Sequence, residues 1–596
     1  MQSRPSSVSG WCVVDGSLCA ELDPATPGMK AVSTRFQTTL AVIQHHENIH
    51  RITLMDNPRA LLAIALSFLV LLIWQAWMED YGPQPEPVTK TTVTETPAVS
   101  ESGEDLPVAP DDQPPTGGEQ DVTVQLPAGQ RIEVVTDMFR AVIDTRGGDL
   151  REVDLLHYMK SPDEGSEAFR LLEESASQLF IAQSGLRAAK GPEPTHHANF
   201  QVDQNHFELA DDAEVLEVPL RWNNDAGVEV TKIYRFRRGS YVVEVEQQIR
   251  NMGDTDWSAR PYHQLQRTAL QQQSRFLYTY TGGVLYSPED KYQKISFDDM
   301  QDEDLSRDVK NGWAAMIQHY FLGAWIPPLE QTARYYSRAL QGERYVIGMI
   351  GQSVQVAAGS EQSTQARLYV GPKLQHVMEE VAPGLELTVD YGVLTILAQP
   401  IFWLLEKIHA LVGNWGWSII FLTILIKLAF FKLSETSYKS MANMRKLAPR
   451  LKTLKERYGD DKQKLNQAMM DMYKKEKINP LGGCLPVLVQ IPVFIALYWV
   501  LLESVEMRQA PFMLWIQNLS APDPYFILPL IMGATMLIQQ KLNPAPMDPM
   551  QAKVMMILPV VFTVFFAFFP SGLVLYWVVN NTLSIAQQYV ITKRVE

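Results

Sequence analysis

The chain has 596 residues, a formal net charge of −15 at pH 7 and three cysteines. Its charge is uneven, because residues 79–391 contain 27 Lys/Arg against 50 Asp/Glu while the rest of the chain nets +8. This division, with most of the long apolar runs in the basic part, excludes a single soluble domain and indicates two compartments.

The first 120 residues contain three predicted segments. Residues 1–54 lack helical or strand periodicity, and they are either a disordered extension or the product of a start codon assigned too early; the fresh start at Met55 favours the second. Residues 55–80 are predicted to be a transmembrane signal anchor, because residues 60–78 form an uncharged apolar run of 19. Residues 81–120, rich in Pro, Thr, Glu and Gly, are predicted to be a disordered linker.

Residues 121–390 are predicted to form an all-β sandwich. Short alternating runs, such as residues 241–246, are separated by turn signals, such as residues 146–149. A domain of this size has a core large enough to need no disulfide, and these residues contain no cysteine. Residues 391–413 follow as a predicted interfacial amphipathic helix, because three charged or titratable side chains interrupt their apolar sequence.

Residues 414–596 are predicted to form a helical membrane core. Five apolar segments are candidate spans: Trp415–Leu433, Gly482–Leu502, Tyr525–Gln540, Met555–Phe569 and Gly572–Ile591. The third and fourth are short, so a re-entrant pair is the alternative to two complete spans. Together with the signal anchor, they predict a polytopic α-helical membrane protein with six transmembrane helices and a large all-β domain.

Loop charges predict the orientation of this protein. With the N-terminus inside, residues 79–391 are exported, and residues 434–480, with 12 Lys/Arg against 6 Asp/Glu, stay inside. The C-terminus, with Lys593 and Arg594, is also inside, and every short loop then obeys the positive-inside rule. The pattern is typical of the bacterial inner membrane, with residues 79–391 periplasmic and residues 434–480 and the C-terminus cytoplasmic.

The cytoplasmic segment 434–480 is predicted to be a helical hairpin with its turn at residues 458–461. Most of its basic residues are expected to form a solvated face. Five of them are a candidate docking surface for anionic lipid headgroups, ribosomal RNA or a targeting factor: Lys439, Arg445, Lys446, Arg450 and Lys452.

Lys427 is the most informative residue, because it lies inside an apolar segment. A cation at the bilayer centre costs about 2.5–3.5 kcal/mol on insertion scales. One interpretation is snorkelling to the headgroups; the other is a charge in a water-filled cavity. The second is favoured because Lys432 already anchors the helix and Thr423 lies on the same face as Lys427. Gln490 either lines the same groove or forms an interhelical hydrogen bond.

No catalytic or metal-binding motif is present. The sequence has no nucleotide loop, no HExxH, no GxSxG and no Cys/His metal spacing. Its 11 histidines are scattered, and His196-His197 is predicted to be an ordinary surface pair in a polar loop rather than a metal site. We therefore expect no catalytic residue, no metal and no cofactor.

Long motifs in the C-terminal part resemble the YidC family of membrane protein insertases. The resemblance is close over residues 392–596 and extends through architecture over residues 55–391. The motifs that carry it are Asp460-Asp461-Lys462-Gln463-Lys464, Asn479-Pro480-Leu481-Gly482-Gly483-Cys484-Leu485-Pro486, Glu506-Met507-Arg508-Gln509-Ala510-Pro511-Phe512 and Phe569-Pro570-Ser571-Gly572-Leu573-Val574-Leu575-Tyr576. In such proteins the exported domain is a periplasmic β-supersandwich.

The resemblance implies an ATP-independent insertase and folding chaperone that works alone and together with the Sec translocon. Lys427 would be the groove cation, and Thr423, Gln490, Tyr576 and Trp577 would line the groove. Implied partners are nascent inner-membrane proteins, the Sec translocon with its accessory SecD and SecF proteins, membrane lipids, and the ribosome with the signal-recognition-particle machinery. Relatives usually carry arginine where this chain has Lys427, and commonly tyrosine where it has Trp577.

Two other functions compete with this interpretation. A transporter or channel would use Lys427 as an ion or substrate site, but the sequence shows no internal repeat. A membrane-anchored periplasmic sugar-binding or sugar-modifying domain would have its pocket in residues 121–385, and it leaves the basic hairpin unexplained. Deletion of most of the β domain separates these functions, because an insertase should remain active and a sugar enzyme should not.

Overall fold

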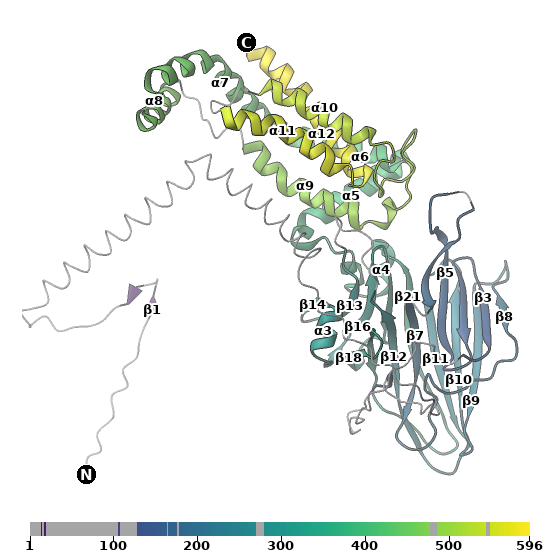
Figure 1. The fold of residues 1–596 in the computed structure, drawn as a ribbon. Helices are drawn as coiled ribbons and strands as arrows, with labels where there is room; N and C mark the ends of the chain where they lie inside the picture. The colour runs from purple at the N-terminus through teal and green to yellow at the C-terminus, as the bar shows by residue number, and fades with distance from the viewer. Residues whose placement is uncertain are drawn as a thin grey trace, which may run out of the picture. The chain divides into compact units, whose positions relative to one another are not determined.

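Figure 1 shows the chain in a computed structural model that describes residues 13–14, 17–18, 105–107, 128–163, 165–175, 178–269, 279–459, 461–476, 485–543 and 549–595. The chain divides into two units, residues 1–100 and 101–596. In the first unit only strands β1 (Val13–Val14) and β2 (Ser17–Leu18) are described, and they pair antiparallel. The predicted signal anchor and the predicted linker, except residues 105–107, lie outside the described residues.

Two sheets make up the β domain within the described residues. The eight-stranded sheet has the order β14 (Lys291–Ile295), β13 (Gly282–Ser287), β16 (Trp313–Gln318), β17 (Phe321–Ile326), β21 (Glu361–Pro372), β11 (Val242–Asn251), β10 (Val228–Arg237) and β9 (Val215–Asn223). The eleven-stranded sheet has the order β15 (Leu305–Lys310), β18 (Thr332–Leu340), β19 (Arg344–Ile350), β12 (Trp257–Thr268), β7 (Leu179–Ala188), β6 (Ala168–Glu174), β5 (Asp149–Met159), β4 (Phe139–Asp144), β3 (Arg131–Val135) and β8 (His206–Glu208), and β20 (Val354–Val356) pairs with β12. Neighbouring strands pair antiparallel except β3 and β8.

The alternating sequence pattern explains which strand residues are buried. In β11, Val243 and Val245 are buried, while Glu244 and Glu246 are half-buried and form ion pairs with arginines of β10 at 2.9 and 2.6 Å. One apolar cluster takes buried residues from both sheets, including Trp325 of β17. Burial of a large aromatic side chain removes about 150–250 Å² from water, at about 25 cal/mol per Å². The prediction of a β-rich domain is confirmed.

The turn at residues 146–149 was predicted from its glycines, and it joins β4 to β5. Gly147 has a φ of 79°, in the left-handed region that favours glycine. A Cβ atom on Gly147 would lie 2.4 Å from the carbonyl oxygen of His196. Fully buried Lys232 donates from Nζ to the carbonyl oxygens of Gly147 and Ser184, at 2.7 Å each, and burial lowers its pKa to about 8. The turn is therefore fixed from two sides.

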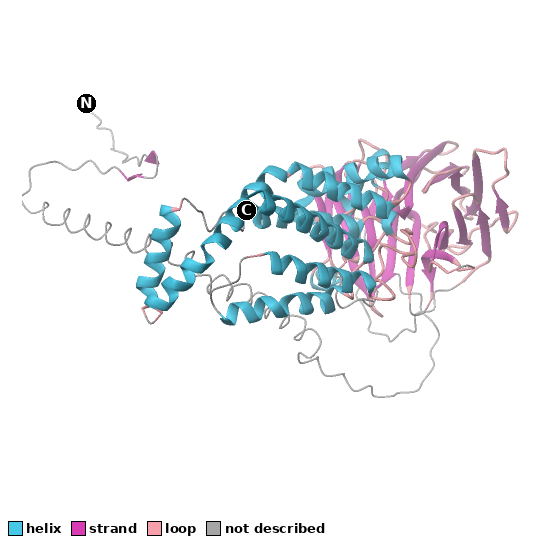
Figure 2. Ribbon diagram, turned by 90° about the horizontal axis from the view of Figure 1, so that it is seen from above, coloured by secondary structure: helices cyan, strands magenta, loops and turns pink. Residues whose placement is uncertain are grey.

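Most helices follow the strands in the chain, as the order of colours in Figure 1 shows. Figure 2 draws the helices in cyan and the strands in magenta. Two short ones belong to the β domain, α3 (Phe297–Asp302) and α4 (Gln375–Val381). The C-terminal part contains α5 (Thr395–Val412), α6 (Trp415–Ala429), α7 (Phe431–Tyr458), α8 (Lys462–Lys475), α9 (Leu485–Glu503), α10 (Ile527–Leu542), α11 (Pro549–Phe566) and α12 (Ser571–Val595). Short 3-10 helices cover Leu385–Thr388, Gly392–Leu394 and Val505–Met507.

Helices α6, α9, α10, α11 and α12 overlap the five predicted spans, with ends that differ by up to six residues. By length and composition, α5 alone qualifies as a span among the described helices. Helices α6 and α7 qualify together as a pair bent by 67°, and α9, α10 and α11 contain shorter apolar helices. The count of six transmembrane helices remains a prediction.

Helix α5 carries apolar residues on more than one face: Phe402 and Leu405 are buried, whereas Ile396 and Leu411 are 84% and 89% exposed. Its interfacial position stays a prediction. Helix α6 ends at Ala429 rather than continuing to residue 433, and the chain bends into α7 at Phe430.

Helices α7 and α8 pack together as the hairpin predicted for residues 434–480. Asp461 starts α8, because its side chain accepts a hydrogen bond from the backbone N–H of Lys464 at 3.1 Å. The described part of α8 ends at Lys475, and the predicted stop at residues 479–480 lies outside the described residues.

The β domain and the helices meet within the second unit at buried polar contacts. Lys373 and Glu503, the last residue of α9, form an ion pair of 3.6 Å with side chains 2% and 6% exposed. The Nε2 atom of His319 lies 2.9 Å from the carbonyl oxygen of Leu502, and burial lowers the pKa of His319 to about 4. The end of α9 is therefore joined to the β domain by both a charge pair and a hydrogen bond.

Candidate functional site

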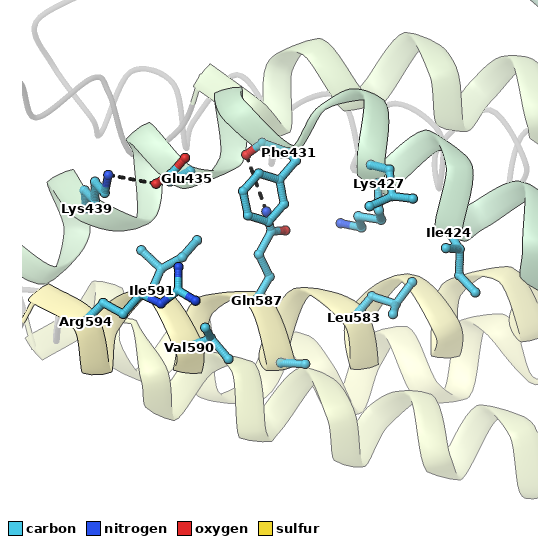
Figure 3. A pocket seen from close by; sticks show the side chains of 12 residues that line it. Ile424, Lys427, Phe431, Glu435, Lys439, Leu583, Gln587, Val590, Ile591 and Arg594 are labelled. Atoms are coloured by element: carbon cyan, nitrogen blue, oxygen red, sulfur yellow. Dashed lines mark hydrogen bonds and ion pairs between the residues drawn. The ribbon is translucent and has the colours of Figure 1, made fainter.

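A pocket of about 390 Å³ lies between the α6–α7 pair and α12 (Figure 3). One wall carries Lys427 from α6 together with Glu435 and Lys439 from α7, and the other carries Gln587 and Arg594 from α12. Its remaining lining is apolar: Ile424, Leu428, Phe431, Leu583, Ala586, Val590 and Ile591. An apolar pocket with a few converging polar groups is the usual form of a binding site.

Lys427 enters the pocket from the last turn of α6, which is a favourable position for a cation because the C-terminus of a helix is electronegative. Its Nζ atom donates to the hydroxyl of Ser584 on α12 at 2.7 Å. The Ser584 hydroxyl in turn donates to the carbonyl oxygen of Asn580 at 2.7 Å. Lys427 thus lines the pocket and has a neutral hydrogen-bond partner. The choice between snorkelling and a water-filled cavity stays a prediction.

Gln490 extends these contacts from α12 to α9. Its Nε2 atom donates to the side-chain oxygen of Asn580 at 2.6 Å. Hydrogen bonds therefore connect α6, α12 and α9 through Lys427, Ser584, Asn580 and Gln490. The sequence left open whether Gln490 lines a groove or bonds between helices, and in the structure it makes an interhelical hydrogen bond.

Like Gln490, the other three predicted groove residues lie outside the lining of this pocket. Thr423 is 1% exposed, and its hydroxyl donates to the carbonyl oxygen of Ile419 in its own helix at 2.6 Å. Tyr576 is 1% exposed and its ring stacks on Phe494. Trp577 packs against Phe494 edge-on. These side chains pack the helices behind the pocket rather than face it.

The five predicted docking cations of the hairpin are exposed on α7. Lys439 pairs with Glu435 at 2.8 Å and also lines the pocket, Lys446 donates to the carbonyl oxygen of Val595, and Arg450 pairs with Glu476 at 2.9 Å. Arg445 and Lys452 are the remaining two members. Lys439 is therefore the member of this group that also belongs to the pocket.

Sequence reasoning missed Ser584, Glu435 and Arg594. Ser584 lies four residues after Asn580, which places both on one face of α12, so helical spacing from the conspicuous asparagines could have found it. Glu435 carries no signal in the sequence, because an acidic residue four positions before a lysine is common on solvated helices. Its place in the pocket depends on the bend between α6 and α7.

Exposed apolar side chains gather on α11. Met556, Ile557, Val560 and Val564 are each 58–61% exposed. On α9, Ile491 is 45% exposed. Contiguous exposed apolar surface of this kind marks contact with lipid or with another protein.

Comparisons with known proteins agree over most of the chain. Residues 131–404 match the family described as "YidC periplasmic domain", and residues 407–596 match the family described as "60Kd inner membrane protein". A relative from Methylococcus capsulatus, named "Membrane protein insertase YidC", is 54% identical over 550 residues, which cover 91% of this chain and 99% of that protein. A relative of the same name from Thioalkalivibrio sulfidiphilus is 52% identical over 555 residues, covering 91% and 99%. A crystal structure of an active YidC insertase covers 78% of this chain and 93% of that chain, with 18% identity and a TM-score of 0.37.

Proposed function

Since the chain belongs to the YidC family of membrane protein insertases, we propose that it inserts newly made proteins into the bacterial inner membrane through the pocket around Lys427. The relatives support the insertase function and the inner-membrane location, and the matched family names a periplasmic domain. The observation that carries the finer proposal is the position of Lys427, a cation that faces an otherwise largely apolar pocket and has a neutral partner.

The first step of the proposed mechanism is electrostatic attraction. A carboxylate of the client, the protein being inserted, would pair with Lys427 in place of Ser584. Two unit charges at 4 Å attract by about 4 kcal/mol at an effective dielectric constant of 20. A hydrogen bond from a charged group to a neutral partner contributes about 1.5–3 kcal/mol. The client carboxylate therefore displaces the hydroxyl, and a binding step of this kind needs no nucleotide.

The second step is release of the apolar client segment into lipid. The exposed apolar side chains of α11, and those of α9, provide a surface along which a client helix exchanges protein contacts for lipid contacts at little cost. We propose residues 482–502 and 555–569 as this exit surface; most of their described members lie in α9 and α11.

The hairpin and the periplasmic domain would bind partner molecules. The exposed cations on α7 support a role for the hairpin in docking anionic lipid headgroups or ribosomal RNA on the cytoplasmic side. The β domain would contact the Sec translocon through its accessory SecD and SecF proteins, while small clients would be inserted without the translocon. In this topology the hairpin and C-terminus are cytoplasmic and residues 79–391 are periplasmic.

The experiment is insertion of a small, acidic-tailed client in cells depleted of the native protein. Lys427→Arg should retain insertion, because the charge remains. Lys427→Ala should reduce it by at least about tenfold, since loss of one such charge contact removes roughly 1.4 kcal/mol or more. Lys427→Glu should abolish insertion, because it repels the client carboxylate.

Lys432→Ala is the matched control. Lys432 lies five residues further along, its side chain is 91% exposed, and it pairs with Glu435 at 3.5 Å. This variant removes the same charge outside the pocket and should insert the client like the parent. If Lys427→Ala and Lys427→Glu also insert it like the parent, the charge mechanism is wrong.

A further inference from the structure

Asp105, His196 and His197 bring three potential metal ligands together on the β domain. The Nε2 atom of His197 lies 2.9 Å from Oδ1 of Asp105, and the Nε2 atom of His196 lies 3.1 Å from Oδ2 of Asp105. One ligand atom from each residue lies within 4.8 Å of the other two. Asp105 and His197 are 92 positions apart, so the fold rather than a local motif assembles this cluster.

His196 differs from the surface histidine that the sequence predicted, because the structure buries it to 2% exposure. The reason is the tight turn at Gly147, which packs against the backbone of His196. The Nδ1 atom of His196 lies 2.6 Å from the hydroxyl of Tyr262, which also accepts a hydrogen bond from the His196 backbone N–H at 2.9 Å. This contact fixes the ring and leaves Nε2 directed at Asp105.

The Nε2 atom of His196 is buried and has no hydrogen-bond partner of acceptable geometry among the described residues, although Asp105 lies within ion-pair distance. A ligating histidine typically bonds through one ring nitrogen to a protein group and offers the other nitrogen to the metal. The contact of Nδ1 with Tyr262 and the position of the buried Nε2 atom, 3.1 Å from the Asp105 carboxylate, together match that arrangement.

The backbone that carries Asp105 is held in place without its carboxylate. The carbonyl oxygen of Asp105 accepts a hydrogen bond from Nε2 of Gln264 at 3.1 Å. Two residues later, the carbonyl oxygen of Pro107 accepts one from the guanidinium of Arg187 at 2.7 Å. The segment 105–107 is therefore docked on the eleven-stranded sheet by main-chain contacts, and the carboxylate of Asp105 makes its contacts with the two histidines only through its side chain.

We propose that Asp105, His196 and His197 form a binding site for a divalent transition-metal ion of the zinc type. Two neutral imidazoles and one carboxylate give a donor set that zinc prefers, whereas Ca²⁺ and Mg²⁺ prefer oxygen ligands only. Zinc binds imidazole nitrogen and carboxylate oxygen at about 2.0–2.2 Å, so the ligand atoms need to move by only about an ångström. Water would complete the coordination. Beyond the cluster, the charges that act on His197 are Asp149 and Arg146, which have opposite signs.

Metal binding would attach the segment around Asp105 to the β domain. Asp105 precedes the first strand of the β domain, while both histidines lie after β7, so one ion would bridge the two parts of the chain. Because a metal that binds only the folded arrangement stabilises it, metal should hold the segment 105–107 on the domain more firmly than its hydrogen bonds and ion pairs do alone.

The test is Zn²⁺ binding to the full chain, purified in detergent without a histidine tag and stripped with a chelator. Isothermal titration should show one saturable site per chain with a Kd of micromolar order or tighter. Co²⁺ should bind at the same site with the visible absorption of a tetrahedral complex. His197→Gln and Asp105→Asn should each weaken binding at least about tenfold, and Tyr262→Phe, which releases the His196 ring, should weaken it about tenfold.

His206→Gln is the matched control, because His206 also pairs with carboxylates, Glu133 and Glu208, but is exposed and does not belong to a three-ligand cluster among the described residues. It should bind Zn²⁺ like the parent. The proposal is overturned if the parent shows no saturable site below millimolar Zn²⁺, or if His197→Gln and Asp105→Asn both bind like the parent. Asp105 lies outside the sheets, so its variant tests the site even where a histidine variant fails to fold.

Discussion

Ser584 holds the key position beside Lys427, because it is the neutral group that a client carboxylate would have to displace. An aspartate at this position would place a permanent carboxylate within ion-pair distance of the Lys427 Nζ atom. Such an internal pair competes with the client. We therefore expect Ser584→Asp to lower insertion of an acidic-tailed client by at least about tenfold, measured in depleted cells.

The control for this prediction is Thr582→Asp. Thr582 is exposed on the same helix, and its hydroxyl donates to its own helix at the carbonyl oxygen of Val578. This variant adds the same charge two residues away from Ser584, on a different face of α12, and should insert the client within about twofold of the parent. Ser584→Ala should also insert normally, because it removes only the partner that the client displaces.

His263 should make the β domain sensitive to acid. Burial, followed by the nearby charge of Lys232, lowers the pKa of His263 to about 3. The histidine is neutral in the folded domain, so its contribution to stability is complete above its unfolded pKa of about 6.5 and is lost as the pH falls toward 3. Lowering the pH from 7 to 5 should cost about 2 kcal/mol through this residue.

The corresponding variant is His263→Phe, which retains a ring beside Trp325. Amide hydrogen exchange of β12 in the full chain, corrected for intrinsic rates, should show that this variant loses about 2 kcal/mol less than the parent between pH 7 and pH 5. His206→Phe, at an exposed site, should show the pH dependence of the parent. Equal losses in the parent and His263→Phe would contradict the prediction.

Residues whose chemistry conflicts with their neighbours in the sequence could be predicted as candidates. Residues that matter only because of a contact in the folded protein could not. Lys427 was visible because a cation in an apolar run is costly. Ser584 was not, since a serine in a helix studded with polar residues becomes informative only when Lys427 is placed against it. His196 was assigned to the surface because its neighbours are polar, and the Gly147 turn that buries it is 49 positions earlier in the chain.

At the scale of helices, Gly533 brings α10 and α11 into close contact. A Cβ atom on Gly533 would lie 2.1 Å from the hydroxyl oxygen of Thr563, which itself donates to the carbonyl oxygen of Pro559. Small residues allow helices to approach closely in membranes. Gly533→Leu should therefore destabilise the helical core by about 1–3 kcal/mol, measured by denaturant unfolding in detergent. Ala534→Leu, at the exposed neighbouring position, should leave the unfolding midpoint unchanged.

The apolar runs were enough to predict that these helices exist. They were not enough to predict where each helix ends or how it packs. The prediction extended α6 to residue 433 because apolar composition continues past Phe430, but the chain bends there by 67°. The charges of α5 led to the prediction of an interfacial helix, and its apolar residues include both buried and exposed ones. In both cases composition records how apolar a segment is, and only packing against other helices determines its path.

At the scale of the whole molecule, the uneven charge indicated the division into a β-rich part and a helical part. The contacts that join the two parts could not be predicted, because Lys373 and Glu503 are 130 positions apart and neither belongs to a motif. The pair is nearly fully buried, and a buried charge without its partner is costly.

Lys373→Met should therefore destabilise the full chain by about 3–5 kcal/mol, because it leaves Glu503 buried and unpaired. The double variant Lys373→Met/Glu503→Leu should recover most of that loss, since it removes both charges and retains apolar contact. Free energies of unfolding in detergent for the parent, both single variants and the double variant form the test. An additive double variant would show that the two side chains do not interact.

Because of the bend at Phe430, one wall of the pocket is divided between α6 and α7, whereas the other wall is the single helix α12. Lys427 lies before the bend and is tied to α12, whereas Glu435 and Lys439 lie after it on α7. A rotation of α7 about Phe430 would move Glu435 and Lys439 together and leave Lys427 in place. Under the proposed mechanism, the pocket could then admit client helices of different diameters while Lys427 keeps the same contact with the client carboxylate.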